Sequence, residues 1–323
     1  MKPFQFLAEA REPVSARELG DRARRAEATG YHALVIPDHL LDQLSPVPAM
    51  AVIAAATTRL RVSAFVLNND LRHPAVLAQD LASLDVLSGG RLEIGIGAGW
   101  NAPEYRAIGL PFEAVGTRVA RLEEAVAVLK GSFGPGPFSY AGQHYTITEL
   151  DGRPKPIQRP HPPLFIGGGG RWLLSLAGRE ANIVGLAPRL LPGVRGDPSS
   201  ITIAATEEKI AWVREAAGAR FDRLELNIYP SMSPVVVTDH ARPAASRLAN
   251  RLAKRTGVEV SPGDLLDSPH IFIGSVDELV DKLRSLRERL GVSSIMVGTL
   301  DELSGVSSAW LAPDPSRPTG PPV

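Results

Sequence analysis

Residues 89–105 combine a strand pattern with closely spaced glycines. Gly95, Gly97 and Gly99 follow one another at every second position, where an apolar run passes into a polar loop. A residue without a side chain lets backbone N–H groups approach a ligand closely. The segment therefore predicts a cradle for a flat, anionic cofactor. The residues that we expect to contact this cofactor here are Gly97, Ala98, Gly99 and Trp100.

Asp38 and His39 follow a short apolar run, residues 33–37, that is typical of a buried parallel strand. Histidine donates or accepts a proton near neutral pH. His39 is the only one of the seven histidines that comes directly after a predicted barrel strand. We therefore predict that His39 is catalytic. The alternative is a histidine that only forms a hydrogen bond within its loop.

Four glycines, Gly167 to Gly170, precede a predicted helix that begins near Arg171. Free N–H groups at a helix N-terminus favour an anion, and an arginine adds charge-assisted hydrogen bonds. We predict a phosphate site at Gly168, Gly169, Gly170 and Arg171, with an ordinary tight turn as the alternative. No Gly-Lys-Ser/Thr follows, which argues against nucleoside triphosphate chemistry.

Aromatic and acidic residues complete the candidate site. Trp100 is placed to form a wall for a flat ring, and Phe65 is a second candidate that also suits the core. Glu104 lies one helical turn after Trp100 and is a second catalytic candidate. No pair of histidines has the spacing of metal ligands on a helix face, so we predict no metal site.

Apolar runs alternate with helical patterns along most of the chain. Ser15 and Glu18 have the spacing of a capping box, which marks the start of the first helix. The alternation predicts an α/β fold, a (β/α)8 TIM barrel, whose active site lies at the carboxyl ends of the strands. The predicted strands are residues 4–8, 33–37, 60–67, 92–97, 164–166, 183–186, 224–229 and 294–297. The predicted helices are residues 16–28, 48–57, 74–87, 116–130, 172–179, 206–217, 240–255 and 275–290.

Two stretches depart from this alternation. Residues 131–163 are rich in glycine and proline and include a hairpin pattern that turns at Gly142. We predict an insertion loop at the carboxyl face, a candidate lid within a barrel domain of residues 1–312. Residues 313–323 are proline-rich and almost without apolar residues, so we expect a disordered tail.

Composition limits the possible partners. The 323 residues carry 35 basic and 35 acidic side chains, and no basic stripe indicates binding to nucleic acid. The chain has no cysteine, which excludes disulfides and thiolate chemistry. Charge near the N-terminus and the lack of long apolar runs lead us to expect a cytoplasmic protein with no membrane association.

Several of these segments together resemble the bacterial-luciferase-like superfamily. The resemblance extends to about residue 300, and residues 68–70 and 211–218 look most like the actinobacterial coenzyme F420-dependent oxidoreductases. The segments that carry it are residues 36–39, 67–78, 87–100 and 162–170.

The resemblance implies a barrel that binds either reduced FMN or the reduced deazaflavin coenzyme F420. It implies a non-proline cis peptide near Ala64–Phe65 and a proton-donor role for His39. Trp100 stands where sugar-phosphate dehydrogenases of the deazaflavin group have a glutamate, which argues against a sugar-phosphate substrate and leaves Glu104 or Glu9 as the acid. The remaining residues that we expect to contact the cofactor are Asp38, Ala64, Phe65 and Asn68.

Three functions follow as hypotheses. The first is an oxidoreductase that uses reduced F420 for hydride transfer to a small organic substrate. The second is an FMN-dependent monooxygenase that incorporates molecular oxygen. The third is a non-catalytic flavin-binding barrel, since a fold alone does not determine a function. The resemblance also implies a homodimer.

Overall fold

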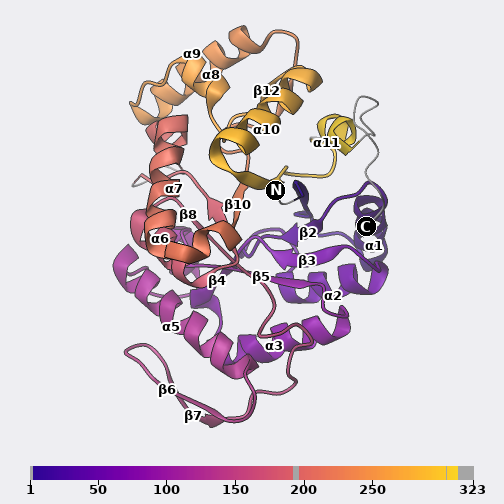
Figure 1. Cartoon of the computed structure of the whole chain (residues 1–323), viewed down its shortest axis with the longest axis vertical. Coiled ribbons are helices and arrows are strands. Elements are labelled where there is room, and N and C mark those ends of the chain that lie inside the picture. The colour runs from indigo at the N-terminus through magenta and orange to yellow at the C-terminus, as the bar shows by residue number, and fades with distance from the viewer. Residues whose placement is uncertain (1–2, 192–195, 303, 312–323) are drawn as a thin grey trace.

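Eight parallel strands close into a barrel in the computed structural model (Figure 1), which describes residues 3–191, 196–302 and 304–311. Each strand pairs with the next in the order β3-β2-β1-β13-β10-β9-β8-β5, and a β3–β5 pairing closes the ring. The predicted TIM barrel is therefore confirmed. The predicted tail, residues 313–323, lies outside the described residues. The strands are β1 (Gln5–Glu9), β2 (Ala33–Ile36), β3 (Arg61–Ala64), β5 (Leu92–Gly97), β8 (Leu164–Gly168), β9 (Ile183–Leu186), β10 (Glu225–Ile228) and β13 (Val292–Met296).

Helices surround the barrel and begin close to the predicted positions. Ser15 and Glu18 form the expected capping box at the start of α1. Between β1 and β10 the described part of the chain forms seven α-helices and two 3-10 helices outside the third strand. They are α1 (Ala16–Ala28), α2 (Pro46–Ala56), α3 (Pro74–Leu87), α4 (Ala102–Ala107), α5 (Val115–Phe133), α6 (Arg171–Glu180), η2 (Pro198–Ile201), α7 (Ile203–Ala217) and η3 (Gly218–Arg223). α10 (Val276–Leu290) precedes β13, and α11 (Ser304–Leu311) follows it.

The third strand is interrupted, although the sequence predicts one strand over residues 60–67. β3 ends at Ala64, and β4 (Leu67–Asn68) resumes the pairing with β5 before the 3-10 helix η1 (Asn69–Leu71). The non-proline cis peptide lies between Phe65 and Val66, one bond after the expected position. The chain therefore bulges between its two pairings with β5.

Glycines of β5 make room for this bulge. A Cβ atom at Gly95 would stand 1.9 Å from the carbonyl oxygen of Ala64, and one at Gly97 would stand 2.7 Å from the Val66 side chain. Real Cβ atoms do not come so close to a backbone oxygen. The absent side chains at these two positions therefore accommodate the protein's own chain, whereas the sequence suggested room for a ligand.

A buried ion cluster lies where the same strands begin. Glu93 of β5 accepts a hydrogen bond from His32 at 2.8 Å and pairs with Arg61 of β3 at 2.6 Å. Burial opposes the charged carboxylate, but the contacts with His32 and Arg61 outweigh it and hold the pKa of Glu93 below its ordinary value. The cluster joins three neighbouring strands at the amino end of the barrel.

The insertion between α5 and β8 begins and ends on the side of the barrel where the strands begin. Its hairpin extends from there toward the carboxyl ends of the strands. Its hairpin, β6 (Phe138–Ala141) and β7 (Thr146–Leu150), is antiparallel and turns near Gly142, as predicted. Glu124 of α5 accepts hydrogen bonds from the backbone of residues 143–145. Tyr145 contacts Asn69 and His73, which follow the carboxyl end of β4. The tip of the hairpin thus meets the carboxyl face from outside α5.

A second excursion follows β10 and forms a small core of its own. The sequence predicts one helix in this region, residues 240–255, but the structure adds a second helix and a two-stranded parallel sheet. Leu248, Leu265 and Ile271 are among the apolar residues buried there. Its elements are β11 (Val236–Val237), α8 (Ala241–Thr256), α9 (Pro262–Asp267) and β12 (Ile273–Gly274).

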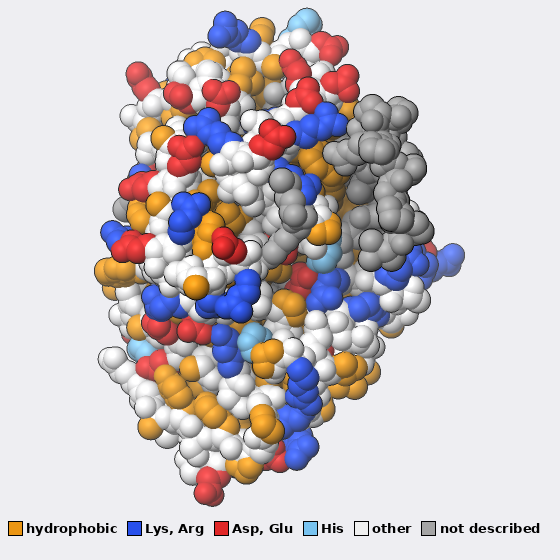
Figure 2. Space-filling view, in the orientation of Figure 1, with side chains coloured by type: hydrophobic (Ala, Val, Ile, Leu, Met, Phe, Trp, Pro, Cys, Tyr) orange, Lys and Arg blue, Asp and Glu red, His pale blue; other side chains and the backbone are white. Residues whose placement is uncertain are grey.

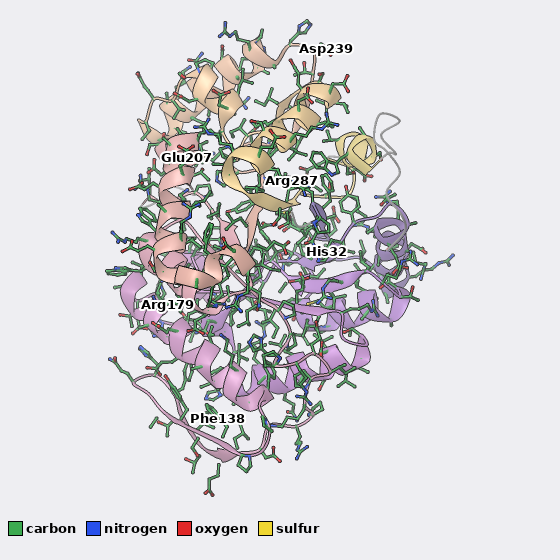
Figure 3. The ribbon with its side chains drawn as sticks, viewed as in Figure 1. His32, Phe138, Arg179, Glu207, Asp239 and Arg287 are labelled. Atoms are coloured by element: carbon green, nitrogen blue, oxygen red, sulfur yellow. The ribbon has the colours of Figure 1, made fainter. Side chains whose placement is uncertain are left out.

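The two excursions lie at opposite ends of the longest axis. Figure 3 shows Phe138 of the hairpin at one end and Asp239, just before α8, at the other. On the face drawn in Figure 2, basic and acidic side chains are interspersed. Among the residues that the structure describes, no helix is both long and apolar enough to cross a membrane.

The packing at Gly95 generates a stability prediction. Gly95→Ala should destabilise the fold by about 2 to 3 kcal/mol, because the new methyl group must displace the Ala64 carbonyl from the barrel wall. Urea unfolding followed by circular dichroism measures this change. Gly263→Ala is the matched control, because its Cβ would meet only the Ser261 hydroxyl at 3.6 Å. Equal stability of the two variants would contradict the packing argument.

Candidate active site

His39 and Glu104 lie in direct contact at the carboxyl ends of the strands. His39 follows β2 and Glu104 lies on the short helix α4 after β5. His39 Nδ1 is 3.1 Å from both carboxylate oxygens of Glu104. The His39 side chain is 18% exposed and that of Glu104 is 7% exposed. The imidazole therefore faces the open side of the pair, with the carboxylate behind it.

The hydrogen-bond partner of Nδ1 determines which tautomer the His39 imidazole adopts. A carboxylate oxygen accepts hydrogen bonds, so the contact requires that Nδ1 of His39 carry a hydrogen and donate a hydrogen bond to Glu104. Nε2 then presents a lone pair when the ring is neutral and an N–H when it is protonated. No group in the described part of the chain forms a hydrogen bond with Nε2. The pair can exchange a proton with a bound molecule through this atom.

Trp100 stands beside this pair. Its ring contacts that of His39 edge to face, with centroids 5.3 Å apart, and its side chain is 38% exposed. An aromatic surface that is exposed next to a proton-exchanging group suits a flat ligand. The structure thus brings together three of the predicted site residues, His39, Glu104 and Trp100.

Asp38 binds protein groups at the base of the site. Both of its carboxylate oxygens accept hydrogen bonds from Arg72, at 2.6 and 3.0 Å, and one also accepts the backbone N–H of Asn68 at 2.9 Å. A bidentate arginine fixes a carboxylate firmly. Asp38 therefore anchors the loop after β2 to the segment after β4. Arg72 was not predicted, although it lies in the polar run that follows the third strand.

Asn68 continues this network toward α4. Its side-chain oxygen accepts the hydroxyl of Tyr105 at 3.0 Å, and Tyr105 also donates to Asp70 at 2.9 Å. Burial and the neighbouring Asp70 carboxylate raise the pKa of Tyr105 to about 12, so it remains a donor. Arg121 of α5 binds the other oxygen of Asp70 at 2.9 Å. These contacts position α4 and hence Glu104.

The glycine-rich loop after β5 is held by its carbonyl groups. Arg118 donates to the carbonyl of Ala98 at 3.0 Å and also to that of Gly99. Gly99 has a φ of +72°, and a Cβ there would stand 1.9 Å from the Tyr105 hydroxyl. The loop therefore needs glycine at residue 99 for its own geometry. Arg118 is another positioning residue that the sequence did not reveal.

Phe65 and Ala64 belong to the barrel wall. The ring of Phe65 is half-buried and packs against Phe165 and Tyr229, with centroids 5.0 and 5.6 Å away. The carbonyl of Ala64 accepts a hydrogen bond from Ser63 at 3.1 Å. The sequence suggested either the core or the cofactor wall for Phe65, and these contacts place its ring among the residues that fill the barrel.

The glycine run before α6 divides into packed and open positions. Cβ atoms at Gly168 and Gly169 would stand 2.4 Å from Leu173 and 2.3 Å from the Pro188 carbonyl, but nothing lies within 4 Å of one at Gly170. No side chain caps the first turn of α6. Arg171 extends to Glu215 of α7 and binds it at 2.9 Å. The helix N-terminus itself is therefore the part best suited to an anion.

In the described ranges of the chain, no cluster of three or more His, Asp or Glu side chains could hold a metal ion. The site comprises a histidine supported by a carboxylate, an exposed indole and an uncapped helix N-terminus, all in segments that follow the carboxyl ends of barrel strands. Such a set can bind a flat anionic cofactor and move a proton beside it.

Comparison with known proteins agrees with this description. Residues 2–294 match the family model described as luciferase-like monooxygenase. The FMNH2-dependent dimethylsulfone monooxygenase of Pseudomonas putida is 36% identical over 141 residues, 44% of this chain and 39% of that protein. The F420-dependent glucose-6-phosphate dehydrogenase of Kineococcus radiotolerans is 32% identical over 179 residues, 53% of this chain and 52% of that protein. The chain thus spans about half or less of these curated relatives.

Solved structures show the same fold at low sequence identity. The coenzyme F420-dependent tetrahydromethanopterin reductase of Methanopyrus kandleri superposes with a TM-score of 0.74 at 20% identity and covers 96% of this chain and 98% of its own. The EDTA monooxygenase of Chelativorans sp. BNC1 gives 0.75 at 13% identity and covers 96% and 93%. The match of the family model over nearly the whole barrel shows that this chain belongs to the luciferase-like monooxygenase family, which includes both F420-dependent and FMNH2-dependent members.

Proposed function

We propose that this chain is an oxidoreductase that uses reduced coenzyme F420 for hydride transfer to a small organic substrate. The observation that carries the proposal is the contact of His39 with Glu104 beside the exposed face of Trp100. Hydride transfer to a carbon centre leaves a negative charge that a proton must neutralise. A histidine with one nitrogen held and the other free is suited to supply that proton.

The roles of the two residues follow from their burial. His39 is the proton donor, because its Nε2 is free to meet a substrate. Glu104 is a positioning residue: its buried carboxylate fixes the tautomer of His39 and stabilises the protonated ring. Glu9, the other acid considered, has its carboxylate bound to Arg11 at 2.6 Å. Glu104 thus supports the histidine rather than replacing it.

The remaining residues fit a cofactor with a flat ring and a phosphate. The bound cofactor would supply the hydride. The open side of Gly170 and the uncapped first turn of α6 would hold its phosphate, and Trp100 would border its ring system. Asp38, Asn68 and Arg118 keep the loops around it in place. Phe65, packed against Phe165 and Tyr229, would exclude water from the side of the cofactor's ring system that faces the barrel.

An FMN-dependent monooxygenase is the second candidate. The specific support for it is the dimethylsulfone monooxygenase relative, which has the higher identity, 36%, over a shorter part of this chain. The F420-dependent relatives align over a longer part, 53% and 55% of the chain. The histidine and the phosphate site suit either cofactor, so a measurement of cofactor binding must discriminate between F420 and FMN.

We also propose a homodimer acting within the cytoplasm, with residues 131–163 shaping access to the substrate.

Anaerobic titration of the purified chain with F420 and FMN, each oxidised and reduced, tests the choice of cofactor. We expect reduced F420 to bind with a dissociation constant of about 1 to 10 µM and FMN to bind at least tenfold more weakly. Quenching of tryptophan fluorescence measures both. A preference for reduced FMN would establish the second candidate, and failure to bind any of the four would leave the non-catalytic barrel.

Substitutions at the pair test the assigned roles. His39→Ala should lower kcat by about 100- to 10,000-fold while cofactor binding remains within a fewfold of the parent, because only the proton donor is lost. Glu104→Gln should lower kcat more than it raises KM.

Glu123→Gln is the matched control for Glu104→Gln. Glu123 lies on the exposed side of α5, where it pairs with Arg179, and the same loss of charge there should leave both kcat and KM unchanged. Full turnover by His39→Ala with the substrate of the parent enzyme would refute the proposed mechanism.

A further inference from the structure

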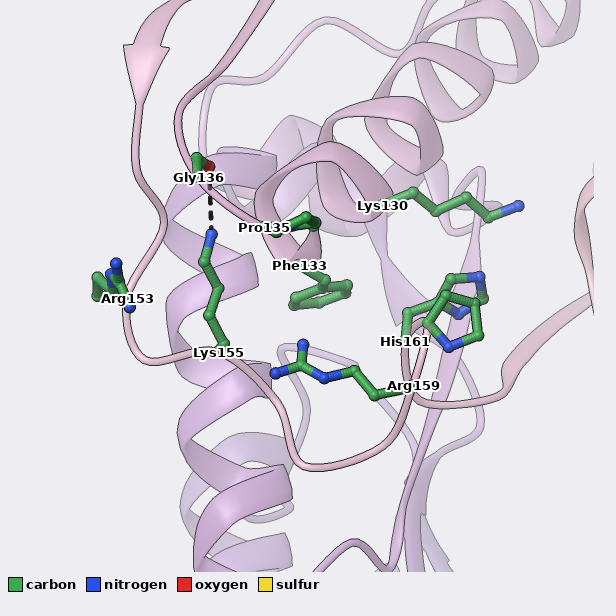
Figure 4. A pocket seen from close by; sticks show the side chains of 10 residues that line it. Lys130, Phe133, Pro135, Gly136, Arg153, Lys155, Arg159 and His161 are labelled. Atoms are coloured by element: carbon green, nitrogen blue, oxygen red, sulfur yellow. Dashed lines mark hydrogen bonds between the residues drawn. The ribbon is translucent and has the colours of Figure 1, made fainter.

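A cavity of about 650 Å³ lies on the opposite side of the barrel from the candidate active site. Its walls come from the C-terminal end of α5 and from the loops that lead into β8, so it lies where that strand begins. Phe133, Pro135 and Pro160 give it an apolar lining, and basic side chains surround them (Figure 4). None of its residues takes part in the site at His39.

Positive charge exceeds negative charge in this cavity. Four cationic side chains line it, and two carboxylates pair with three of them. Asp151 binds Arg153 and Lys155 at 2.9 and 3.2 Å. Glu180 of α6 binds Lys130 at 2.6 Å. The cationic lining residues are Lys130, Arg153, Lys155 and Arg159.

Arg159 is the lining cation without a partner. In the part of the chain that the structure describes, no hydrogen bond or ion pair engages its guanidinium group, and its side chain is exposed. His161, on the same wall, has its Nδ1 bound to the carbonyl of Pro162 at 2.8 Å, which leaves Nε2 free. Burial lowers the pKa of His161 and the nearby Lys130 adds to this effect, whereas the hydrogen bond with the Pro162 carbonyl and the Glu180 carboxylate oppose it.

Two lysine side chains connect the walls of this cavity through backbone carbonyls. Lys155 donates to the carbonyl of Ser132 at 3.1 Å, which ties the entering loop to the end of α5. Lys130 donates to the carbonyl of Glu180 at 3.0 Å, which ties α5 to α6. A preformed cavity with an unpaired guanidinium and a surplus of two positive charges favours a compact dianion.

We propose that this cavity is a second ligand site, which binds the oxyanion group of a phosphorylated small molecule through Arg159. The guanidinium would contact two phosphate oxygens at once, the geometry in which arginine binds such groups best. Lys130 and Lys155 would add attraction without leaving their present partners, and the apolar lining would contact the organic part of the ligand. Free phosphate offers the same oxyanion without that organic part.

Isothermal titration calorimetry of the full chain with inorganic phosphate, pyrophosphate and adenosine monophosphate tests the site. We expect binding of at least one of them, and Arg159→Gln should weaken it by about tenfold or more, since a hydrogen bond to a charged group is lost. A stronger response to the nucleotide identifies a phosphorylated organic ligand, and a stronger response to the inorganic anions identifies free phosphate. The imidazole proton signal of His161, assigned with His161→Asn, should shift as ligand is added.

Two control variants separate binding in the cavity from binding elsewhere on the chain. Arg284→Gln removes the same charge from an exposed position on α10, where Arg284 pairs with Asp281, and should leave binding unchanged. Arg171→Gln reports on the N-terminus of α6. Absence of binding would overturn the proposal. Equal loss in Arg159→Gln and Arg284→Gln, or loss in Arg171→Gln alone, would overturn it as well. Unchanged unfolding midpoints show that the variants are folded.

Discussion

The position of His39 depends on a closed ring of contacts among three parts of the chain: Asp38–His39, Asn68 and Glu104–Tyr105. Asp38 binds the backbone of Asn68, the side chain of Asn68 binds Tyr105, and the neighbours of these residues, Glu104 and His39, bind each other. Each link fixes the next, and every member except His39 is buried. The ring joins the ends of β2, β4 and β5, so the closure of the barrel and the geometry of the site are one constraint.

Both ends of the barrel combine ion pairs with contacts to backbone carbonyls. At the carboxyl ends, Asp38 pairs with Arg72, and Arg118 binds the carbonyls of Ala98 and Gly99. At the amino ends, Glu93 lies between His32 and Arg61, and Lys130 binds both the carboxylate and the carbonyl of Glu180. The long insertion before β8 contacts both ends of the barrel, because it starts at the C-terminal end of α5, near the amino ends of the strands, and places Tyr145 beside Asn69 at the carboxyl ends. Chemistry and accessory binding can therefore occupy separate faces of one domain.

The alternation of short, mainly apolar segments with helical patterns predicted the barrel. It also predicted helix α3 and strands β5 and β9 at their observed bounds. His39, Glu104 and Trp100 were predicted as polar or aromatic residues after strands, and the structure brings them together.

Asp38 was a candidate for the cofactor, but its partner Arg72 lies 34 positions away, and no local pattern indicates a contact over that distance. The glycines of β5 suggested room for a ligand, but a missing side chain looks the same in a sequence when the chain itself fills the space, as Ala64 and Val66 do here. The interruption at Phe65–Val66 and the elements β11, α9 and β12 depend on tertiary packing that propensities do not encode.

The fit between Gly95 and the Ala64 carbonyl also has an evolutionary consequence. A chain that acquired any side chain at position 95 would have to move its third strand outward, and that shift would displace Asn68 and the contacts beyond it. Substitutions in the two strands can therefore persist only as matched pairs. Among homologous sequences, residues 64–66 and 95–97 should covary, even though none of them needs to touch a substrate.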